Sequence, residues 1–140
     1  MSLRAPSRRA ALQSLGLFAA LLLVGCAGRP STPSNTLLDA LRSFHAHLQW
    51  ENYGAAISQV DPSYRPAFTT LIRAQGKLTE WEIGAVDLPE PPGDAATVLA
   101  RWSGYRMPDL TVRTGVWRES WRRKGEVWTL TMLEPVEQGL

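Results

Sequence analysis

Few side chains of this sequence have a type and spacing that could support chemistry. Cys26 is the only cysteine of the 140 residues, which excludes an internal disulfide and a cysteine-based metal site. His45 and His47 lie two residues apart in a segment of helical periodicity, so they face different ways and do not form a metal-binding pair. We expect both at the boundary of the buried helix face. A phosphate loop, a Gly-x-Ser-x-Gly elbow, a His-Glu-x-x-His pair and a calcium loop are all missing. We predict no metal, no cofactor and no catalytic residue.

The four residues that end at this cysteine, Leu23-Val24-Gly25-Cys26, resemble the lipobox of bacterial lipoproteins. The resemblance implies cleavage before Cys26, a diacylglycerol on its sulfur and a fatty acyl chain such as palmitate on its new amino group. Three arginines without an acid precede an apolar run over residues 15–24, which is typical of a secretory signal. An uncleaved signal anchor is the alternative, but the run is shorter than the roughly 20 residues of a membrane-spanning helix. A loose twin-arginine pattern at residues 7–12 lacks its usual aromatic residue, which favours ordinary secretion.

The position of Cys26 divides the chain into a signal peptide, residues 1–25, and a mature protein. Residues 26–35 contain the lipidated cysteine and a proline-containing, flexible tether of at most about 30 Å. In lipoproteins an aspartate after the cysteine favours the inner membrane. Ala27 at that place therefore implies the periplasmic face of the outer membrane, with the membrane as partner through the lipid on Cys26.

The net charge of the mature protein does not favour nucleic acid as a partner. The whole chain has 15 basic and 13 acidic side chains. Cleavage would remove three arginines, which leaves 12 against 13 and a net charge of −1.

The apolar periodicity predicts three helices before the first strand. Thr36 and Asp39 have the spacing of a capping box, which we expect to start the first helix. One face of this helix carries an apolar stripe, formed by Leu37, Leu41, Phe44 and Leu48. Asn52 is expected to cap a short second helix that buries Tyr53, Ala56, Ile57 and Val60. A third helix is expected from about Pro66 to Gly76, with Phe68, Leu71 and Ile72 inward.

After Gly76 the apolar residues alternate, which predicts four strands. Trp81, Ile83 and Ala85 alternate in the first strand. The second covers about residues 95–106, with Val98, Ala100 and Trp102 on one face, and the third covers residues 110–123. In the third strand the apolar residues change from even positions, Leu110 and Val112, to odd positions, Trp117 and Trp121. The change occurs across Gly115, which predicts a β-bulge there.

The last hairpin is the sharpest local signal. A two-residue turn at Lys124-Gly125 predicts that Trp121 pairs with Trp128 and Glu119 with Leu130. In the same register Trp117 pairs with Met132. The basic side chains of this strand then lie on the other, solvated face rather than in a nucleic-acid patch: Arg118, Arg122, Arg123 and Lys124.

The hairpin register places the carboxylate of Glu119 on the inward face. An unpaired carboxylate is costly there, so Glu119 is expected either to pair with a neighbouring basic or hydroxyl side chain or to line a cavity. In the second case Glu119 would be the polar contact of a ligand, and three indoles would form the apolar wall: Trp117, Trp121 and Trp128.

Helices followed by strands predict an α+β domain over residues 36–134 with a short C-terminal tail, 135–140, in which N-terminal helices pack on a curved, four-stranded antiparallel sheet. This domain resembles the nuclear transport factor 2-like, cystatin-like cone. The stripe over 37–48, the pattern Trp50-x-x-Tyr53-x-x-Ala56 and the closing segment 125–130 carry the resemblance. It implies a cavity inside the cone, in which enzymes of this fold often place an Asp, His or Tyr. The candidates here are His45, Tyr53, Asp61 and Glu119.

The sequence therefore predicts a lipid-anchored protein that binds a small apolar ligand or an envelope protein without catalysis. The predicted ligand contacts are Tyr53, Trp117, Glu119, Trp121 and Trp128. The alternative is a small periplasmic enzyme. An enzyme needs a polar dyad at the bottom of the cavity, whereas a binding protein needs only an apolar cavity or an exposed apolar patch.

Overall fold

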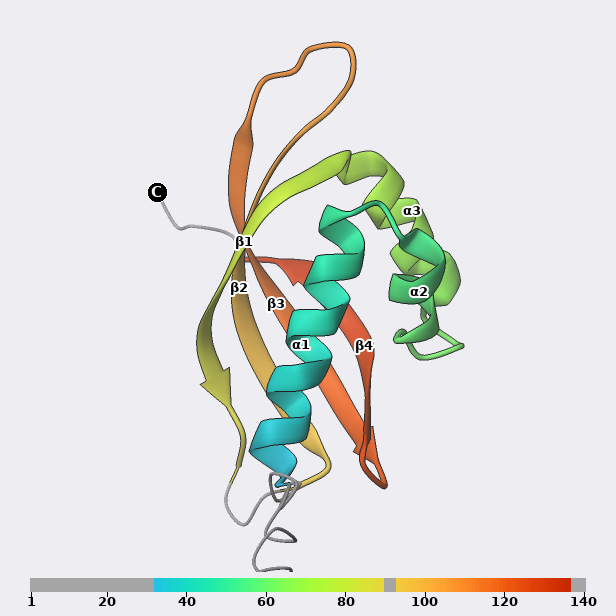
Figure 1. The fold of residues 1–140 in the computed structure, drawn as a ribbon, viewed down its shortest axis with the longest axis vertical. Coiled ribbons are helices and arrows are strands. Elements are labelled where there is room, and N and C mark those ends of the chain that lie inside the picture. The colour runs from blue at the N-terminus through green and yellow to red at the C-terminus, as the bar shows by residue number, and fades with distance from the viewer. Residues whose placement is uncertain (1–31, 90–92, 137–140) are drawn as a thin grey trace, which may run out of the picture. The chain divides into compact units, whose positions relative to one another are not determined.

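The computed structural model describes residues 32–89 and 93–136, and its ribbon is shown in Figure 1. The described helices come first: α1 (Pro33–Gln49), α2 (Tyr53–Ser58) and α3 (Arg65–Gln75). Four strands follow: β1 (Lys77–Asp87), β2 (Ala95–Tyr105), β3 (Arg113–Lys124) and β4 (Val127–Pro135). The strands form one antiparallel sheet in the order β1-β2-β3-β4. The predicted α+β architecture is confirmed. Cys26 and the predicted signal peptide lie outside the described residues.

The curved sheet wraps around α1, and α2 and α3 lie beside the C-terminal half of this helix (Figure 1). The β2–β3 loop, residues 106–112, protrudes at the end of the domain opposite to the start of α1 (Figure 1). None of the helices in the described part of the chain is both long and apolar enough to cross a membrane.

The first helix begins four residues before its predicted start. Thr32 caps it, because the Thr32 Oγ1 accepts a hydrogen bond from the Asn35 amide at 3.2 Å. Pro33 occupies the first turn, where its missing amide hydrogen is not needed. The predicted capping box at Thr36 is therefore wrong, and the last residues of the predicted tether are helical. The predicted apolar stripe is confirmed, since its four side chains are buried in the core.

The predicted bulge at Gly115 is also wrong. The pairing of β2 with β3 runs without a shift from Gly104↔Arg113 to Ala95↔Arg122. Leu110 and Val112 precede the strand and are exposed in the β2–β3 loop, so they do not take part in its alternation. Gly115 lies opposite Trp102 and shares the inward face of the sheet with it.

The register of the β3–β4 hairpin differs from the predicted one. Lys124 pairs with Val127, so the turn consists of Gly125 and Glu126 rather than Lys124 and Gly125. Trp121 pairs with Leu130, and a bulge follows between Ser120 and Trp121. Past this bulge Glu119 pairs with Leu133 instead of Leu130, and Trp117 pairs with Pro135 instead of Met132. The bulge turns Leu133 inward and leaves Met132 exposed.

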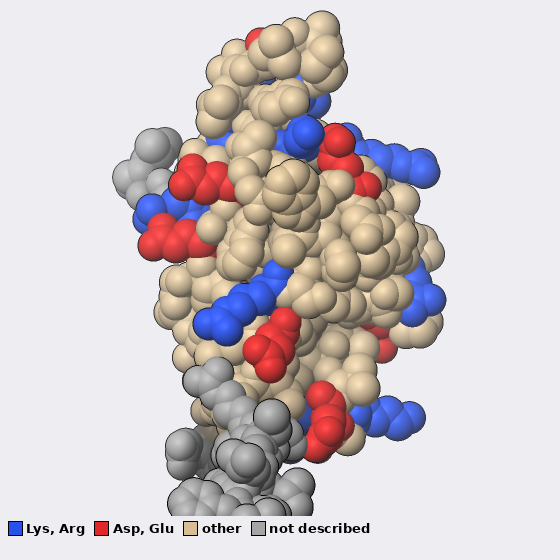
Figure 2. Space-filling model, viewed as in Figure 1, with Lys and Arg blue, Asp and Glu red and all other residues tan. Residues whose placement is uncertain are grey.

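The side chains of β3 lie on the predicted faces, except that of Arg123. Glu119 and the three indoles of the hairpin are buried. Arg118 lies on the outer face and forms a 4.0 Å ion pair with Glu134. Arg123 instead lies on the inward face, opposite Trp128 in the hairpin, with its guanidinium 5.8 Å from the centre of the Trp128 ring. On the face that carries α1, positive and negative side chains are interspersed without a large patch of one sign (Figure 2).

Candidate functional site

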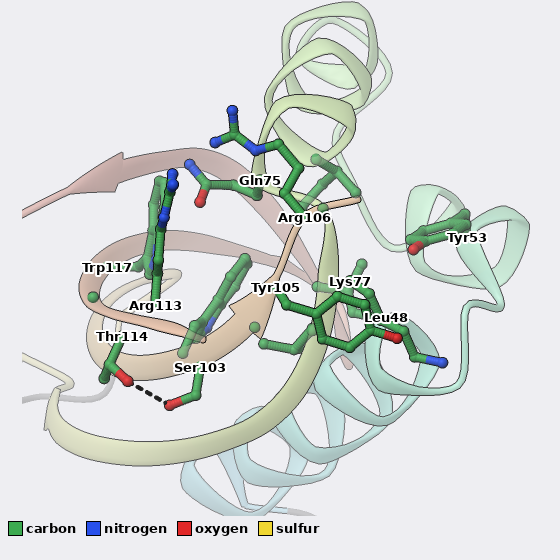
Figure 3. Close-up of a pocket in the computed structure, with 16 residues that line it drawn as sticks. Leu48, Tyr53, Gln75, Lys77, Ser103, Tyr105, Arg106, Arg113, Thr114 and Trp117 are labelled. Carbon is green, nitrogen blue, oxygen red and sulfur yellow. Dashed lines mark hydrogen bonds between the residues drawn. The ribbon is translucent and has the colours of Figure 1, made fainter. Parts of the chain in front are cut away.

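A pocket of about 140 Å³ opens where the end of α1 meets the start of β1, the end of β2 and the start of β3 (Figure 3). We call it the tryptophan pocket because the rings of Trp102 and Trp117 line it, with their centres 5.4 Å apart. Three aliphatic side chains complete the apolar wall: Leu48, Ile72 and Leu78. A cavity of about 150 Å³ can hold a benzene molecule. The tryptophan pocket therefore has room for one ring or a short chain.

Gly115 keeps this space open. It lies opposite Trp102 on the inward face and lines the pocket. A Cβ atom at this position would lie 3.6 Å from Nε1 of Trp117, at ordinary contact distance. A larger side chain would thus extend beside the Trp117 ring into the pocket without backbone strain.

Two further glycines bring β1 and β2 close together beside the pocket. A Cβ at Gly104 would collide with the carbonyl of Lys77, and a Cβ at Gly76 would collide with the carbonyl of Tyr105. Gly76 also has a φ of +84°, a conformation that favours glycine. The strand ends that carry the rim of the pocket can approach only because these side chains are absent.

The rim of the tryptophan pocket is polar and positively charged. Three polar side chains that line the pocket are labelled in Figure 3: Gln75, Arg106 and Arg113. Lys77 also lines the pocket and pairs with Glu51 at 3.5 Å. Arg113 pairs with Asp109 at 3.0 Å, while Arg106 forms no ion pair with a described residue. No carboxylate, imidazole or thiol lines this pocket within the described residues.

A second, larger pocket of about 410 Å³ adjoins the first, and we call it the helix pocket because α2 and α3 supply much of its lining. The two pockets share five residues: Tyr53, Ile72, Gly76, Lys77 and Tyr105. Burial raises the pKa of the Tyr53 hydroxyl, and the nearby Glu51 carboxylate raises it further. Together the pockets reach the size of small-molecule sites, which is roughly 300–1,000 Å³.

A buried pair of His45 and Glu119 joins α1 to β3. Nε2 of His45 lies 2.6 Å from Oε1 of Glu119, and both side chains are fully buried. Nδ1 of His45 donates to the carbonyl of Leu41 at 2.7 Å. Nε1 of Trp121 donates to the second carboxylate oxygen of Glu119 at 3.0 Å.

The prediction that His45 lies at the boundary between the buried and the exposed face of the first helix is therefore wrong. The His45 ring stacks on Trp81 at 4.9 Å between centres and meets Trp102 edge-on at 5.7 Å. Trp81 and Trp102 come from β1 and β2. The curved sheet therefore buries a wider face of α1 than its apolar stripe alone. His47 is half-buried, as predicted.

The protons of this pair can be counted from its partners. The Leu41 carbonyl can only accept, so Nδ1 of His45 carries a proton. A second proton must lie between Nε2 and the Glu119 oxygen, since two acceptors would repel each other at that distance. The pair is neutral whichever atom holds this proton, and both ring nitrogens are engaged. Neither His45 nor Glu119 lines one of the two pockets. The arrangement thus acts as a polar tie between the helix and the sheet.

The structure brings only some of the predicted site residues together. Tyr53 lines both pockets and Trp117 lines the tryptophan pocket. Glu119, Trp121 and Trp128 are buried but line neither. Asp61 is exposed and accepts hydrogen bonds from Ser63.

Sequence reasoning missed the polar rim of the tryptophan pocket. The rim residues lie at or near the ends of different helices and strands, so no periodicity within one element groups them: Gln75, Lys77, Tyr105, Arg106 and Arg113. Trp102 was predicted only as a core residue. It lines the pocket, and its buried Nε1 has no hydrogen-bond partner among the described residues. No group of three or more metal-ligating side chains suited to hold an ion occurs in residues 32–89 and 93–136.

No family model and no curated protein matches this chain. Among solved structures, a nuclear transport factor 2-like protein of unknown function from Shewanella oneidensis MR-1 is 16% identical, with 74% of this chain and 98% of that chain covered and a TM-score of 0.54. A SEC-C-motif-containing protein from Rhodopseudomonas palustris is 17% identical, with 75% and 89% covered and a TM-score of 0.57. At 16% and 17% sequence identity, the similarity to these two proteins concerns the fold alone. The described domain has the nuclear transport factor 2-like fold, and its function must be argued from its pockets.

Proposed function

We propose that this chain is a binding protein that holds a small, largely apolar ligand in its cone and catalyses no reaction on it. The observation that carries the proposal is the lining of the two adjoining pockets, with an aromatic and aliphatic wall and a few polar groups at the rim. This composition is usual for small-molecule sites. The absence of a carboxylate, imidazole or thiol from the described lining of the tryptophan pocket supports binding over acid–base chemistry there.

We further propose that the protein is a lipoprotein, anchored through lipidated Cys26 to the periplasmic face of the outer membrane. The lipobox, the basic and apolar segments before it and Ala27 after it support this proposal. Because α1 begins at Pro33, the segment between Cys26 and the helix can extend at most about 20 Å. The pockets lie near the C-terminal end of α1 (Figure 3), away from the first turn of this helix. The ligand would then enter from the periplasm.

A protein partner is a second candidate, favoured by the exposed β2–β3 loop. Met107, Leu110 and Val112 are 70%, 58% and 64% exposed on this protruding segment. Exposed apolar clusters of this kind are typical of contact sites. A bound ligand, unlike a protein partner at this loop, would also account for the two pockets.

A small periplasmic enzyme is the remaining alternative, and the His45–Glu119 pair is the observation that favours it. A substrate would have to displace Trp81 or Trp102 to reach the imidazole, because these rings cover it. Both ring nitrogens already have partners in the fold. Binding therefore accounts for the geometry more simply.

The proposal is tested by extracting the purified protein with organic solvent and identifying what it carried by mass spectrometry. We expect a small apolar molecule in close to equimolar amount. When the extracted molecule is added back to the emptied protein, it should bind to a saturable site. An extract without a small apolar molecule, together with no binding of any small apolar compound, would contradict the proposal.

A further inference from the structure

We infer that the ligand of the tryptophan pocket is an apolar monocarboxylic acid, whose carboxylate lies at the edge formed by Gln75, Arg106 and Arg113. This inference rests on the proposed function and names the ligand class of the same pocket. It is carried by the charges around the rim, by the direction in which the rim side chains lie and by the volume of the pocket.

The charges around the rim leave one cation uncompensated. Lys77 and Arg113 are each paired with one acid, Glu51 and Asp109 respectively. Arg106 lines the pocket without an ion pair to any described residue. A guanidinium stays charged at all physiological pH values. The rim of the tryptophan pocket thus has one positive charge to spare, which a monoanion balances and which an uncharged ligand does not.

The polar groups of this edge are hydrogen-bond donors suited to a carboxylate, and they lie at one edge of the pocket. Figure 3 shows Gln75 between Arg106 and Arg113, with their polar ends at the same edge of the pocket. Guanidinium and amide N–H groups donate to carboxylate oxygens, and a guanidinium can do so with two parallel hydrogen bonds. Arg113 and Trp117 both line the tryptophan pocket, so the polar edge and the apolar wall face the same space.

The apolar part of the ligand is limited by the volume. The tryptophan pocket of about 140 Å³ accommodates one ring or a short chain between the tryptophans and the aliphatic wall. The adjoining helix pocket allows a longer chain to continue past Tyr53 and Ile72. An acid with a single aromatic ring and a few methylene groups fits both the wall and the rim.

The test compares two probes that share one apolar body and differ in their head, 4-phenylbutanoate and 4-phenyl-1-butanol. Each is titrated by calorimetry into the full-length, lipid-anchored protein in detergent, and a titration into detergent alone is subtracted. Wild-type protein should bind the acid about tenfold or more tightly than the alcohol, which is the scale of one charge-assisted hydrogen bond. Added salt should reduce the preference.

Two variants locate the preference in the pocket. Arg106→Gln removes the uncompensated cation at an exposed position, so it should abolish most of the preference and leave the affinity for the alcohol unchanged. Arg118→Gln is the matched control, because Arg118 is exposed on the outer face of β3 and should not affect either probe. Binding of both probes with equal affinity would overturn the inference and leave the proposed function standing. A preference for the acid that Arg106→Gln does not change would also overturn the inference. Binding of neither probe would overturn it as well. In that last case the extraction experiment still tests the proposed function, through the identity of the extracted molecule.

Discussion

His45 and Glu119 are 74 positions apart in the chain, yet Nε2 of the imidazole and Oε1 of the carboxylate lie 2.6 Å apart inside the core. This contact fixes the rotation of α1 against β3. It also explains how the domain tolerates an inward acid among tryptophans, because both carboxylate oxygens accept a hydrogen bond or share a proton. The two open pockets are formed by other residues.

Removal of the Glu119 carboxylate should destabilise the domain strongly. Glu119→Ala leaves a ring nitrogen of His45 and the indole N–H of Trp121 without their partner, at a cost of about 3 kcal/mol or more. Glu119→Gln can still donate to His45 and accept from Trp121, so we expect a loss of only about 1 kcal/mol and unchanged ligand binding. Denaturant unfolding of both variants measures the difference. A Glu119→Ala variant as stable as the Gln variant would show that the pair does not tie the helix to the sheet.

The turn of the last hairpin should not tolerate a β-branched residue at its first position. Gly125 has a φ of +65° and no atom near its would-be Cβ, so the cost is one of backbone conformation alone. We expect Gly125→Val to lower the free energy of unfolding by about 1 kcal/mol or more, whereas Lys124→Asn should be neutral. Gly54→Ala is the control, since Gly54 lies in α2 with open space around it and without a positive φ. Equal denaturation midpoints for Gly125→Val and wild type would contradict the turn.

The main features of the fold could be predicted from the sequence because burial leaves a periodic trace in each element. The stripe of α1, the end of α3 at Gly76 and the inward face of β2 all follow from local spacing. The start of α1 was misplaced, because the Thr36 and Asp39 spacing resembles a capping box, whereas it is Oγ1 of Thr32 that accepts the capping hydrogen bond from the Asn35 amide. The hairpin register was wrong for two reasons: the turn lies at Gly125-Glu126, and a bulge farther from the turn brings Leu133 rather than Met132 inward.

The candidate site was harder to predict than the fold. Tyr53 and Trp117 were found because they are aromatic and lie on predicted inward faces. Gln75, Arg106 and Arg113 come from three separate element ends, so only the tertiary fold brings them to one edge. Gly115 left a signal in the sequence, but the parity slip was interpreted as a bulge instead of as a space for a ligand.

The Asp61 carboxylate should make a small contribution to stability that depends on pH. Hydrogen bonds from the Ser63 side chain and backbone hold the pKa of this exposed carboxyl below its ordinary value of 3.8. A lowered folded-state pKa gives a contribution that is fully present above pH 3.8 and is lost as the pH falls through the folded-state pKa. The stability difference between wild type and Asp61→Asn should therefore be constant near neutral pH and change only in acid. Unfolding curves at several pH values measure it, and a difference that does not vary with pH would argue against the effect.

Loss of the only thiol should abolish lipid attachment. Cys26→Ser removes the acceptor of the diacylglycerol, so labelled palmitate should be incorporated into wild type and not into the variant. Ala27→Asp is a useful companion, because it should keep the label and shift the protein toward the inner membrane. Equal labelling of wild type and Cys26→Ser would refute the anchor.

If the cone holds a ligand in the tryptophan pocket, a side chain that closes this pocket should exclude the ligand. Gly115→Leu adds a side chain on the inward face beside Trp117, at a position without positive φ. Arg122→Leu adds the same side chain on the exposed outer face of β3. The measurement is the amount of ligand that each purified protein carries per chain, with the unfolding midpoint as a check of folding. We predict a folded Gly115→Leu protein that carries little or no ligand and an Arg122→Leu protein that carries as much as wild type. A folded Gly115→Leu protein with the wild-type amount of ligand would contradict the account.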